Sequence, residues 1–376
     1  LPGVEGVVCG GGHRWTNVSP ELAANLPAKS IVQVGLAGYI SVMHHSAVYQ
    51  LKLVAAPFSN QEGEWFWADG EMKEMLSRSR LYMIGQREEV FFRNFRFLAG
   101  VAIIFDLQCG RRWLRNIQIG LDQFAARVPD GRLLGIAYGE KILRFLHAKP
   151  GSKRKTLFHW FTPDRLFYFY AHGWVKVRHL EDFRRFTRFQ LHYVGISEKR
   201  DSFTRLFAKA HEKRSRILGN ESQLRNSARL TDELTLFLFD AESIEIQAFG
   251  TEKDCDDPRS FSAAATREEI IRDAERAFIK ILKSEYNKVR YSKYPQDDEG
   301  LAKRKIDRIL FTIVEPISFT TAKTAIQGGL LLEQDPNLTG DAIVVEKGKV
   351  RLLVTRKRSA QELKRTRSSR TPTTTK

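Results

Sequence analysis

The sequence predicts an α+β protein of more than one domain, with a small mixed sheet and packed helices in one domain and a separate α+β domain before it. A chain of 376 residues exceeds what one hydrophobic core usually organises. Stretches of strand-like alternation are followed, in the same part of the chain, by stretches of helical periodicity. Short strands and helices mixed in this way are typical of the α+β class.

The first 150 residues contain several strand signals and one helix signal. The segment 148–155 then carries Pro150, Gly151 and a basic cluster, which is typical of a linker. We therefore expect an N-terminal α+β domain over residues 1–150. The strands expected in it are 31–42, 47–55 and 98–107, and the expected short helix is 135–147.

Behind this linker the signals for individual elements are stronger. Gly173 separates two β-rich stretches as in a hairpin, Asp201 stands where it can cap a helix, and Thr266 begins a capping box with Glu269. The expected strands are 166–170, 174–177, 189–196, 234–239 and 243–249, and the expected helices are 203–218 and 266–283. We assign these elements to a second domain, 151–320, followed by a β-rich extension, 321–355, and a disordered basic tail, 356–376.

The balance of charge points to a polyanionic partner. Sixty-one Lys and Arg residues against forty-four Asp and Glu residues give a formal net charge of +17. Two stretches, 141–160 and 183–189, interleave basic with aromatic residues, and the second contains Arg184 and Arg185. Because basic groups neutralise phosphates and aromatic rings stack on bases, we expect nucleic acid as the partner. A solvated basic edge over aromatic core residues is the alternative.

Cysteine usage and hydropathy indicate the compartment. Cys9, Cys109 and Cys255 are odd in number and far apart, which argues against a disulfide framework and against paired zinc ligands. No stretch approaches the roughly 20 apolar residues that a membrane span needs. No secretory signal is visible. We therefore expect a cytoplasmic protein without a membrane partner.

Five residues whose types suit phosphodiester chemistry follow one another in the second domain. They are Tyr193 in a Tyr-Val-Gly triplet at a strand end, Arg205 and His211 on the next helix, Glu275 on a later helix, and Asn287 just after it. This order resembles that of the GIY-YIG nuclease family over about residues 160–295. The triplet is similar to the second motif of that family, while the arginine, glutamate and asparagine stand where the family has its helical arginine, metal-binding glutamate and closing asparagine.

The resemblance implies a metal-dependent endonuclease. Mg²⁺ or Mn²⁺ on Glu275 would polarise the phosphate, Arg205 would neutralise developing charge, and Tyr193 or His211 would position or deprotonate water. The tyrosine of the first motif is expected on the 166–170 strand, with Tyr170 as the candidate.

Glu275 also has support from the residues around it. Helical spacing places it between Ile271 and Ile279 on an apolar face. A carboxylate there must be ion-paired, hydrated at a cleft or bound to a cation, because burying it bare is costly. An ion pair with Arg205 or Arg229 is the alternative to a metal ligand.

Basic residues near these positions could contact a phosphate backbone. Along the predicted helix 203–218 they are Arg205, Lys209, Lys213 and Arg216. The polar segment 220–232 is expected to form a loop over the cleft, where Arg225 and Arg229 could reach the substrate. A surface loop without such contacts fits equally well.

Three functions are compatible with these patterns. The first is a metal-dependent endonuclease in restriction, antiphage defence or repair, with DNA favoured over RNA as the substrate. The second is a nucleic-acid-binding protein with an incomplete active site. The third is a basic subunit of a homo-oligomer or larger assembly.

Overall fold

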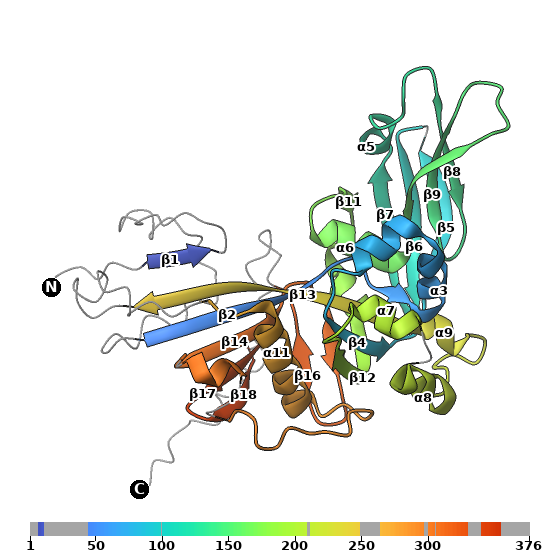
Figure 1. Cartoon of the computed structure of the whole chain (residues 1–376). Helices are drawn as coiled ribbons and strands as arrows, with labels where there is room; N and C mark the ends of the chain where they lie inside the picture. Colours follow the sequence, from blue (N-terminus) through green and yellow to red (C-terminus); the bar gives the residue numbers. More distant parts are fainter. Residues whose placement is uncertain are drawn as a thin grey trace, which may run out of the picture.

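The computed structural model describes residues 7–10, 44–98, 100–208, 211–248, 264–296, 300–304, 306–329 and 340–354. Helices and strands mix along the chain, and the strands described form three sheets of eleven, three and four strands. Figure 1 shows a central sheet with one group of strands projecting from it. The predicted α+β class is confirmed.

The eleven-stranded central sheet is built from both halves of the sequence. Its strands are β1 (Val7–Gly10), β2 (His44–Leu53), β3 (Phe58–Ser59), β4 (Leu81–Gln86), β12 (Arg188–Ile196), β13 (Leu234–Ala248), β14 (Arg308–Ile313), β15 (Ser318–Thr320), β16 (Ala325–Gln327), β17 (Ala342–Glu346) and β18 (Lys349–Leu353). They are ordered β16-β15-β12-β4-β13-β2-β14-β17-β18, and β1 and β3 pair with β13 outside this path. The pairs β12 with β15 and β2 with β14 are parallel, whereas β4 is antiparallel to both of its neighbours. The sheet is therefore mixed, and larger than the small sheet expected.

Helices cover both faces of the central sheet. On one face α11 (Arg267–Leu282) buries Ile271 and Phe278 against Met83 and Leu191. On the other face Phe203 and its neighbours pack on Tyr82, Ile84 and the inward side chains of β13. The helices of this second layer are α3 (Asn60–Ala68), α4 (Gly70–Leu76), α7 (Ser202–Phe207), α8 (Glu212–Asn220) and α9 (Leu230–Glu233). Each fully buried large apolar side chain contributes roughly 1.5–3 kcal/mol, so both layers hold the sheet firmly.

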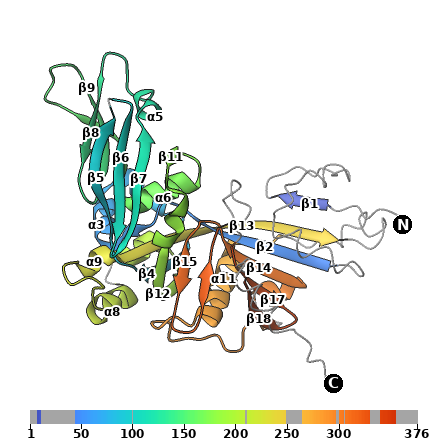
Figure 2. The same ribbon diagram turned by 180° about the vertical axis from the view of Figure 1, so that it is seen from behind.

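Residues 87–187 form a unit with its own core, here called the inserted unit, between β4 and β12. One of its sheets contains β5 (Val90–Leu98), β6 (Ala102–Cys109), β7 (Arg112–Gly120) and β11 (Val177–Arg178); the other contains β8 (Leu133–Tyr138), β9 (Leu143–Ala148) and β10 (Thr156–Phe161). The helices of the unit are α5 (Asp122–Ala125), α6 (Pro163–Ala171) and the 3-10 helix η1 (Glu181–Phe186), and a second 3-10 helix, η3 (Gly300–Arg304), lies outside it. Phe105, Phe145 and Phe161 are among the side chains buried in its core. Figures 1 and 2 both show its strands running away from the central sheet.

The domain boundary expected at residue 150 does not separate two sheets. Residue 150 lies in the turn between β9 and β10, inside the inserted unit, and β4 pairs with β12 and β13 from beyond residue 187. Pairing between strands so distant in sequence leaves no local signal. The β-rich segment expected at 321–355 contributes β16, β17 and β18 to the central sheet, while the tail 356–376 and the strand expected at 31–42 lie outside the described residues.

Several predicted elements are confirmed. The strand expected at 189–196 is β12, Asp201 caps α7 by accepting from the Thr204 N–H, and Thr266 forms the expected capping box with Glu269. The strand expected at 47–55 is β2, and those expected at 234–239 and 243–249 are parts of the single strand β13.

Three other predictions were wrong. Residues 135–147 form β8, a turn and β9 rather than a helix. Residues 166–170 lie in α6 rather than a strand, because Thr162 caps a helix that has Pro163 in its first turn. The single helix expected at 203–218 is two helices, since α7 ends at Phe207 and His211 caps α8.

Candidate active site

The pairing of β4 with β12 brings two tyrosines together across the inserted unit. The strands are antiparallel, and Gly195 stands directly opposite Tyr82. Tyr193 lies on the same face two residues earlier, and its ring centroid is 5.9 Å from that of Tyr82. Tyr82 is fully buried whereas Tyr193 is partly exposed, so Tyr193 is the tyrosine that faces solvent.

Gly195 is required by this close approach. A Cβ at this position would lie 2.8 Å from the hydroxyl oxygen of Tyr82 and 2.5 Å from Cε1 of Tyr193. Carbon atoms do not approach other heavy atoms that closely without a shift of one of them. The glycine of the Tyr-Val-Gly triplet thus leaves the space in which both phenol rings sit.

His211 connects the start of α8 to the buried tyrosine. Its Nδ1 accepts a hydrogen bond from the Arg214 N–H at 3.1 Å, so in the neutral ring the proton is on Nε2. Nε2 lies 2.8 Å from the Tyr82 hydroxyl oxygen and therefore donates to it. Burial, and then the charges of Arg205 and Arg214, lower the pKa of His211 to about 4, which keeps the ring neutral at pH 7.

This tautomer leaves the Tyr82 proton free to be donated to Tyr193. A hydrogen bond from Tyr82 acts to lower the pKa of Tyr193, and the same bond acts to raise the pKa of Tyr82. Burial is the larger influence on both groups and raises both pKa values above the usual one. Hydrogen bonds therefore run from the α8 backbone to His211 and from His211 to Tyr82, and Tyr82 in turn acts on the pKa of Tyr193.

Arg205 and Glu275 add opposite charges beside the tyrosines. Arg205 is exposed on α7, and its guanidinium interacts with Tyr82, Tyr193 and Glu275. Glu275 is partly buried on α11, and burial raises its pKa to about 7 even though Arg205 opposes the change. Glu198 raises the pKa of Glu275 further, and Tyr291 donates a hydrogen bond to its carboxylate. The Glu275 carboxyl is thus close to half-protonated at neutral pH, and a bound cation would favour its charged form.

Asn287 has a structural part in this arrangement. Its side chain accepts from the Val194 N–H at 3.0 Å and donates to the Val194 carbonyl at 2.8 Å. β15 accompanies β12 only as far as Gln190, so in the described structure no strand pairs with Val194 on that side. The buried asparagine therefore replaces a strand partner and holds the end of β12 that carries Tyr193 and Gly195.

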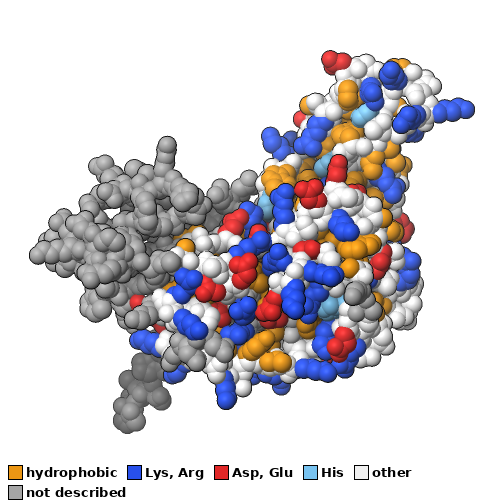
Figure 3. Space-filling view, viewed as in Figure 1, with side chains coloured by type: hydrophobic (Ala, Val, Ile, Leu, Met, Phe, Trp, Pro, Cys, Tyr) orange, Lys and Arg blue, Asp and Glu red, His pale blue; other side chains and the backbone are white. Residues whose placement is uncertain are grey.

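A surface cavity of about 290 Å³ opens next to Arg205. Its other lining residues are Ser197, Glu198, Lys199, Arg200, Thr204 and Ala208. Figure 3 shows Lys and Arg side chains, with some Asp and Glu among them, over the region between α11 and α7. The cavity is wide enough for a phosphate group with its water, and its lining includes three basic residues against one acidic residue.

The remaining predicted site residues lie outside this cluster. Tyr170 belongs to the core of the inserted unit, where its ring lies 5.5 Å from that of Phe183, so it does not accompany Tyr193. Arg184 and Arg185 are partly buried and donate to the carbonyls of Gly328 and Trp113. Tyr170 and Arg185 thus serve the packing of the inserted unit, and Arg184 joins that unit to the segment after β16.

The predicted basic face is divided between two helices. Lys213 and Arg216 belong to α8 and lie near Glu212, while Arg205 belongs to α7 and Lys209 lies outside the described residues. Arg225 and Arg229 are exposed in the loop before β13, and Arg229 pairs with Asp232 at 3.0 Å. Arg216, Arg225 and Arg229 are exposed and Lys213 is partly buried, and their contact with nucleic acid stays a prediction.

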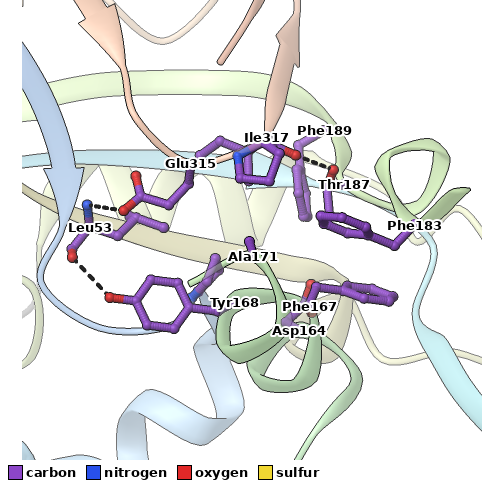
Figure 4. Close-up of a pocket in the computed structure, with 12 residues that line it drawn as sticks. Leu53, Asp164, Phe167, Tyr168, Ala171, Phe183, Thr187, Phe189, Glu315 and Ile317 are labelled. Atoms are coloured by element: carbon purple, nitrogen blue, oxygen red, sulfur yellow. Dashed lines mark hydrogen bonds between the residues drawn. The ribbon is translucent and has the colours of Figure 1, made fainter. Parts of the chain in front are cut away.

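A second, smaller cavity lies beneath α6, between the inserted unit and the central sheet. It holds about 20 Å³, room for about one water molecule. Figure 4 shows Glu315 accepting from the Leu53 N–H at 2.9 Å and Tyr168 donating to the Leu53 carbonyl at 3.2 Å. Burial raises the pKa of Glu315 to about 8, so the carboxyl is largely neutral there. The hydrogen bond from Tyr168 joins the inserted unit to the central sheet at this point. The cavity itself is too small for a substrate.

Tyr82 is the site residue that sequence reasoning missed. It stands in the short apolar stretch Leu-Tyr-Met-Ile-Gly, which has a Tyr followed by a Gly as the triplet at Tyr193 has. A search for a second Tyr-and-Gly strand far upstream would have found it, because the inserted unit separates the two strands. Tyr291, the hydrogen-bond donor to Glu275, carries no comparable signal.

Comparisons with family models, with curated proteins and with solved structures found no match to this chain. Within the described ranges, no group of three or more His, Cys, Asp and Glu side chains could hold a metal. None of the described helices is long and apolar enough to cross a membrane.

Replacing Gly195 by Ala should lower the free energy of unfolding by about 1–3 kcal/mol, because the new methyl group overlaps both tyrosines. Gly219 on α8 is the matched control, since a Cβ there meets nothing within 4 Å. Gly219→Ala should leave stability unchanged or raise it by up to about 1 kcal/mol. Urea unfolding followed by circular dichroism measures both, and equal midpoints would contradict the close approach.

Replacing Asn287 by Ala should cost roughly 2–4 kcal/mol of stability, because the N–H and C=O of Val194 would both lose their partner in a buried position. Asn226→Ala, at an exposed loop position, should change stability by less than about 0.5 kcal/mol. Thermal unfolding of the two variants compares the effects. A loss below 1 kcal/mol at Asn287 would show that β12 does not depend on this side chain.

Proposed function

We propose that this protein is a metal-dependent endonuclease that hydrolyses phosphodiester bonds in nucleic acid, with DNA as the favoured substrate. The observation that carries the proposal is the convergence of Tyr82, Tyr193, His211, Arg205 and Glu275 from five separate elements. A structural ion pair alone would not require two tyrosines and a neutral histidine beside it.

The resemblance to the GIY-YIG nucleases supports the same proposal in a revised form. Tyr82, rather than Tyr170, is the tyrosine that accompanies Tyr193, Arg205 and Glu275. The inserted unit then accounts for the long separation between the two tyrosines. A cytoplasmic location, expected from the cysteine spacing, is part of this proposal.

Glu275 is the residue that would hold Mg²⁺ or Mn²⁺. A partly buried carboxylate whose pKa is raised to about 7 by burial is stabilised when a cation takes the place of its proton. Magnesium sites of this kind use one or two carboxylates and are completed by water and substrate phosphate. When bound, the ion would polarise the phosphate and neutralise charge on it.

The side chains themselves supply binding, orientation and a route for a proton. Arg205 is exposed beside the basic cavity and would bind the phosphate oxygens, where it stabilises charge that develops in the transition state. Tyr193 faces solvent and would orient the attacking water, accepting its proton when the phenol is ionised. His211 and Tyr82 act behind it, because the hydrogen bond that Tyr82 donates favours the ionised form of Tyr193.

Replacing Tyr82 by Phe should lower the rate of DNA cleavage by about 10- to 100-fold at neutral pH and saturating Mg²⁺. The change removes the hydrogen bond to Tyr193, whose pKa should then rise. The increase of the rate with pH should therefore shift to higher pH, an effect that a merely structural role would not produce. Single-turnover cleavage of a labelled duplex between pH 6 and 10 measures both quantities.

The matched control is Tyr170→Phe, which removes a hydroxyl from the inserted unit and should change the rate less than about 2-fold. Tyr193→Phe should lower the rate of DNA cleavage by about 10²- to 10³-fold. Equal losses for Tyr82→Phe and Tyr170→Phe would refute the assignment of Tyr82.

Replacing Glu275 by Gln should abolish cleavage but stabilise the fold at alkaline pH. Burial raises the pKa of Glu275 from 4.5 to about 7 in the folded state, so its favourable contribution is complete below pH 4.5 and is lost as pH rises through 7. At pH 8.5 the variant should be more stable by on the order of 1–3 kcal/mol, and at pH 5 the difference should be small.

The effect of Mg²⁺ on stability distinguishes a metal ligand at Glu275 from a carboxylate with a structural role only. The ion should raise the unfolding temperature of the wild-type protein at pH 8.5 and leave that of Glu275→Gln unchanged. Differential scanning calorimetry with and without Mg²⁺ measures this. Cleavage that survives in the variant would refute the proposed role of Glu275.

A further inference from the structure

The turn between β9 and β10 concentrates positive charge at the far end of the inserted unit. Residues 149–155 include four basic side chains and no acidic one, and all seven positions are exposed. The basic residues are Lys149, Lys153, Arg154 and Lys155. None of the four forms an ion pair with another residue in the described part of the chain.

The turn presents these charges from an ordered backbone. Gly151 has a positive φ of 75°, and the Ser152 N–H donates to the Lys149 carbonyl at 3.0 Å. The Ser152 hydroxyl then accepts from the Arg154 N–H at 3.1 Å. An ordered turn loses less entropy than a flexible segment when it binds a partner.

The inserted unit as a whole is strongly basic. Between residues 87 and 187 there are nineteen Lys and Arg residues and nine Asp and Glu residues, so this unit holds more than half of the net charge of +17. An excess of this size attracts polyanions before any specific contact forms.

The turn lies far from the tyrosines. β4 carries the chain from Tyr82 to Gln86, at the base of the inserted unit, over about 15 Å. The turn before β9 is tied to the same base, because Lys141 pairs with Glu89 at 2.7 Å and with Asp232 at 2.8 Å. β9 and its turn then add about 20 Å in a direction that leads away from the central sheet (Figures 1 and 2). Laid end to end, the two segments span at most about 35 Å, which is about one helical turn of B-form DNA.

The angle of the inserted unit to the central sheet is fixed by buried contacts. Arg87, which is buried, pairs with Asp164 of α6 at 2.7 Å and lies over the ring of Phe189 in β12. Beneath α6, Tyr168 of the inserted unit also donates a hydrogen bond to the Leu53 carbonyl of β2. Because the inserted unit is held at a fixed angle, its far end stays at a fixed distance from the central sheet. A stiff ligand that spans this distance can contact both places.

We propose that the β9–β10 turn binds the backbone of double-stranded nucleic acid about one helical turn away from the bond that is cut. The inference rests on the proposed function for the position of that bond. A duplex is stiff over about 150 base pairs and can join the two places directly, whereas a flexible single strand has no fixed span. The turn contributes affinity without reading sequence, as phosphate contacts do.

The test uses the full chain with Glu275→Gln, so that binding is measured without cleavage. Two duplexes are compared, one extending about 5 and the other about 20 base pairs beyond the position bound at the site. Fluorescence anisotropy measures their binding affinities at several salt concentrations. The long duplex should bind at least about 10-fold more tightly than the short one. Adding Lys153→Ala and Lys155→Ala should remove most of that advantage and reduce the slope of log affinity against log salt by about 1–2.

The matched control is Lys347→Ala with Lys349→Ala, which neutralises two exposed lysines on the turn between β17 and β18. It should keep the full advantage of the long duplex. If the Lys153 and Lys155 variant keeps that advantage too, or if it loses single-stranded and duplex binding equally, the inference is overturned.

The inference and the proposed function fail in different ways. Wild-type protein that cuts DNA while the length effect is absent leaves the nuclease proposal standing and overturns only the role of the turn. Protein that shows the length effect but cuts no DNA or RNA with Mg²⁺ or Mn²⁺ overturns the nuclease proposal, and with it the placing of the turn relative to a cut bond.

Discussion

The antiparallel pairing of β4 with β12 is the constraint on which the rest of the structure depends. It sets Tyr82 opposite Gly195, and the missing side chain of Gly195 leaves the space for both phenol rings. The register is held from outside by Asn287, which completes the hydrogen bonds of Val194. A shift of one residue in this register would turn every side chain of β12 to the other face of the sheet and separate the tyrosines.

Burial favours the neutral form of four side chains in the candidate site. The pKa of His211 is lowered, and those of Tyr82, Tyr193 and Glu275 are raised, with loss of hydration the largest cause in each case. The exposed guanidinium of Arg205 lies beside these groups, and Glu198, Lys199 and Arg200 line the same cavity. An anionic ligand and a cation that enter together suit this setting, because each compensates the charge of the other.

The sequence predicted local features well and long-range pairing poorly. The strand that carries Tyr193, the cap at Asp201 and the capping box at Thr266 depend on neighbouring residues and were recognised from them. Glu275 was found from its place on an apolar helix face. Tyr82 was missed because strand pairing across the inserted unit has no local signature, and the apolar run at 166–170 was mistaken for a strand because a helix buried on several sides is equally apolar.

The inserted unit leaves the central sheet and rejoins it within one strand pair. Gln86 and Gln190 are paired neighbours on β4 and β12, so the chain leaves the sheet and returns to it at almost the same point. Tyr82 and Gly195 lie at the opposite end of that strand pair. Units of other shapes could therefore be grafted at this position without disturbing Tyr82 and Gly195, since insertions are tolerated best where their ends lie close together. A different insertion at this position would change how far the protein reaches and would leave the two tyrosines in place.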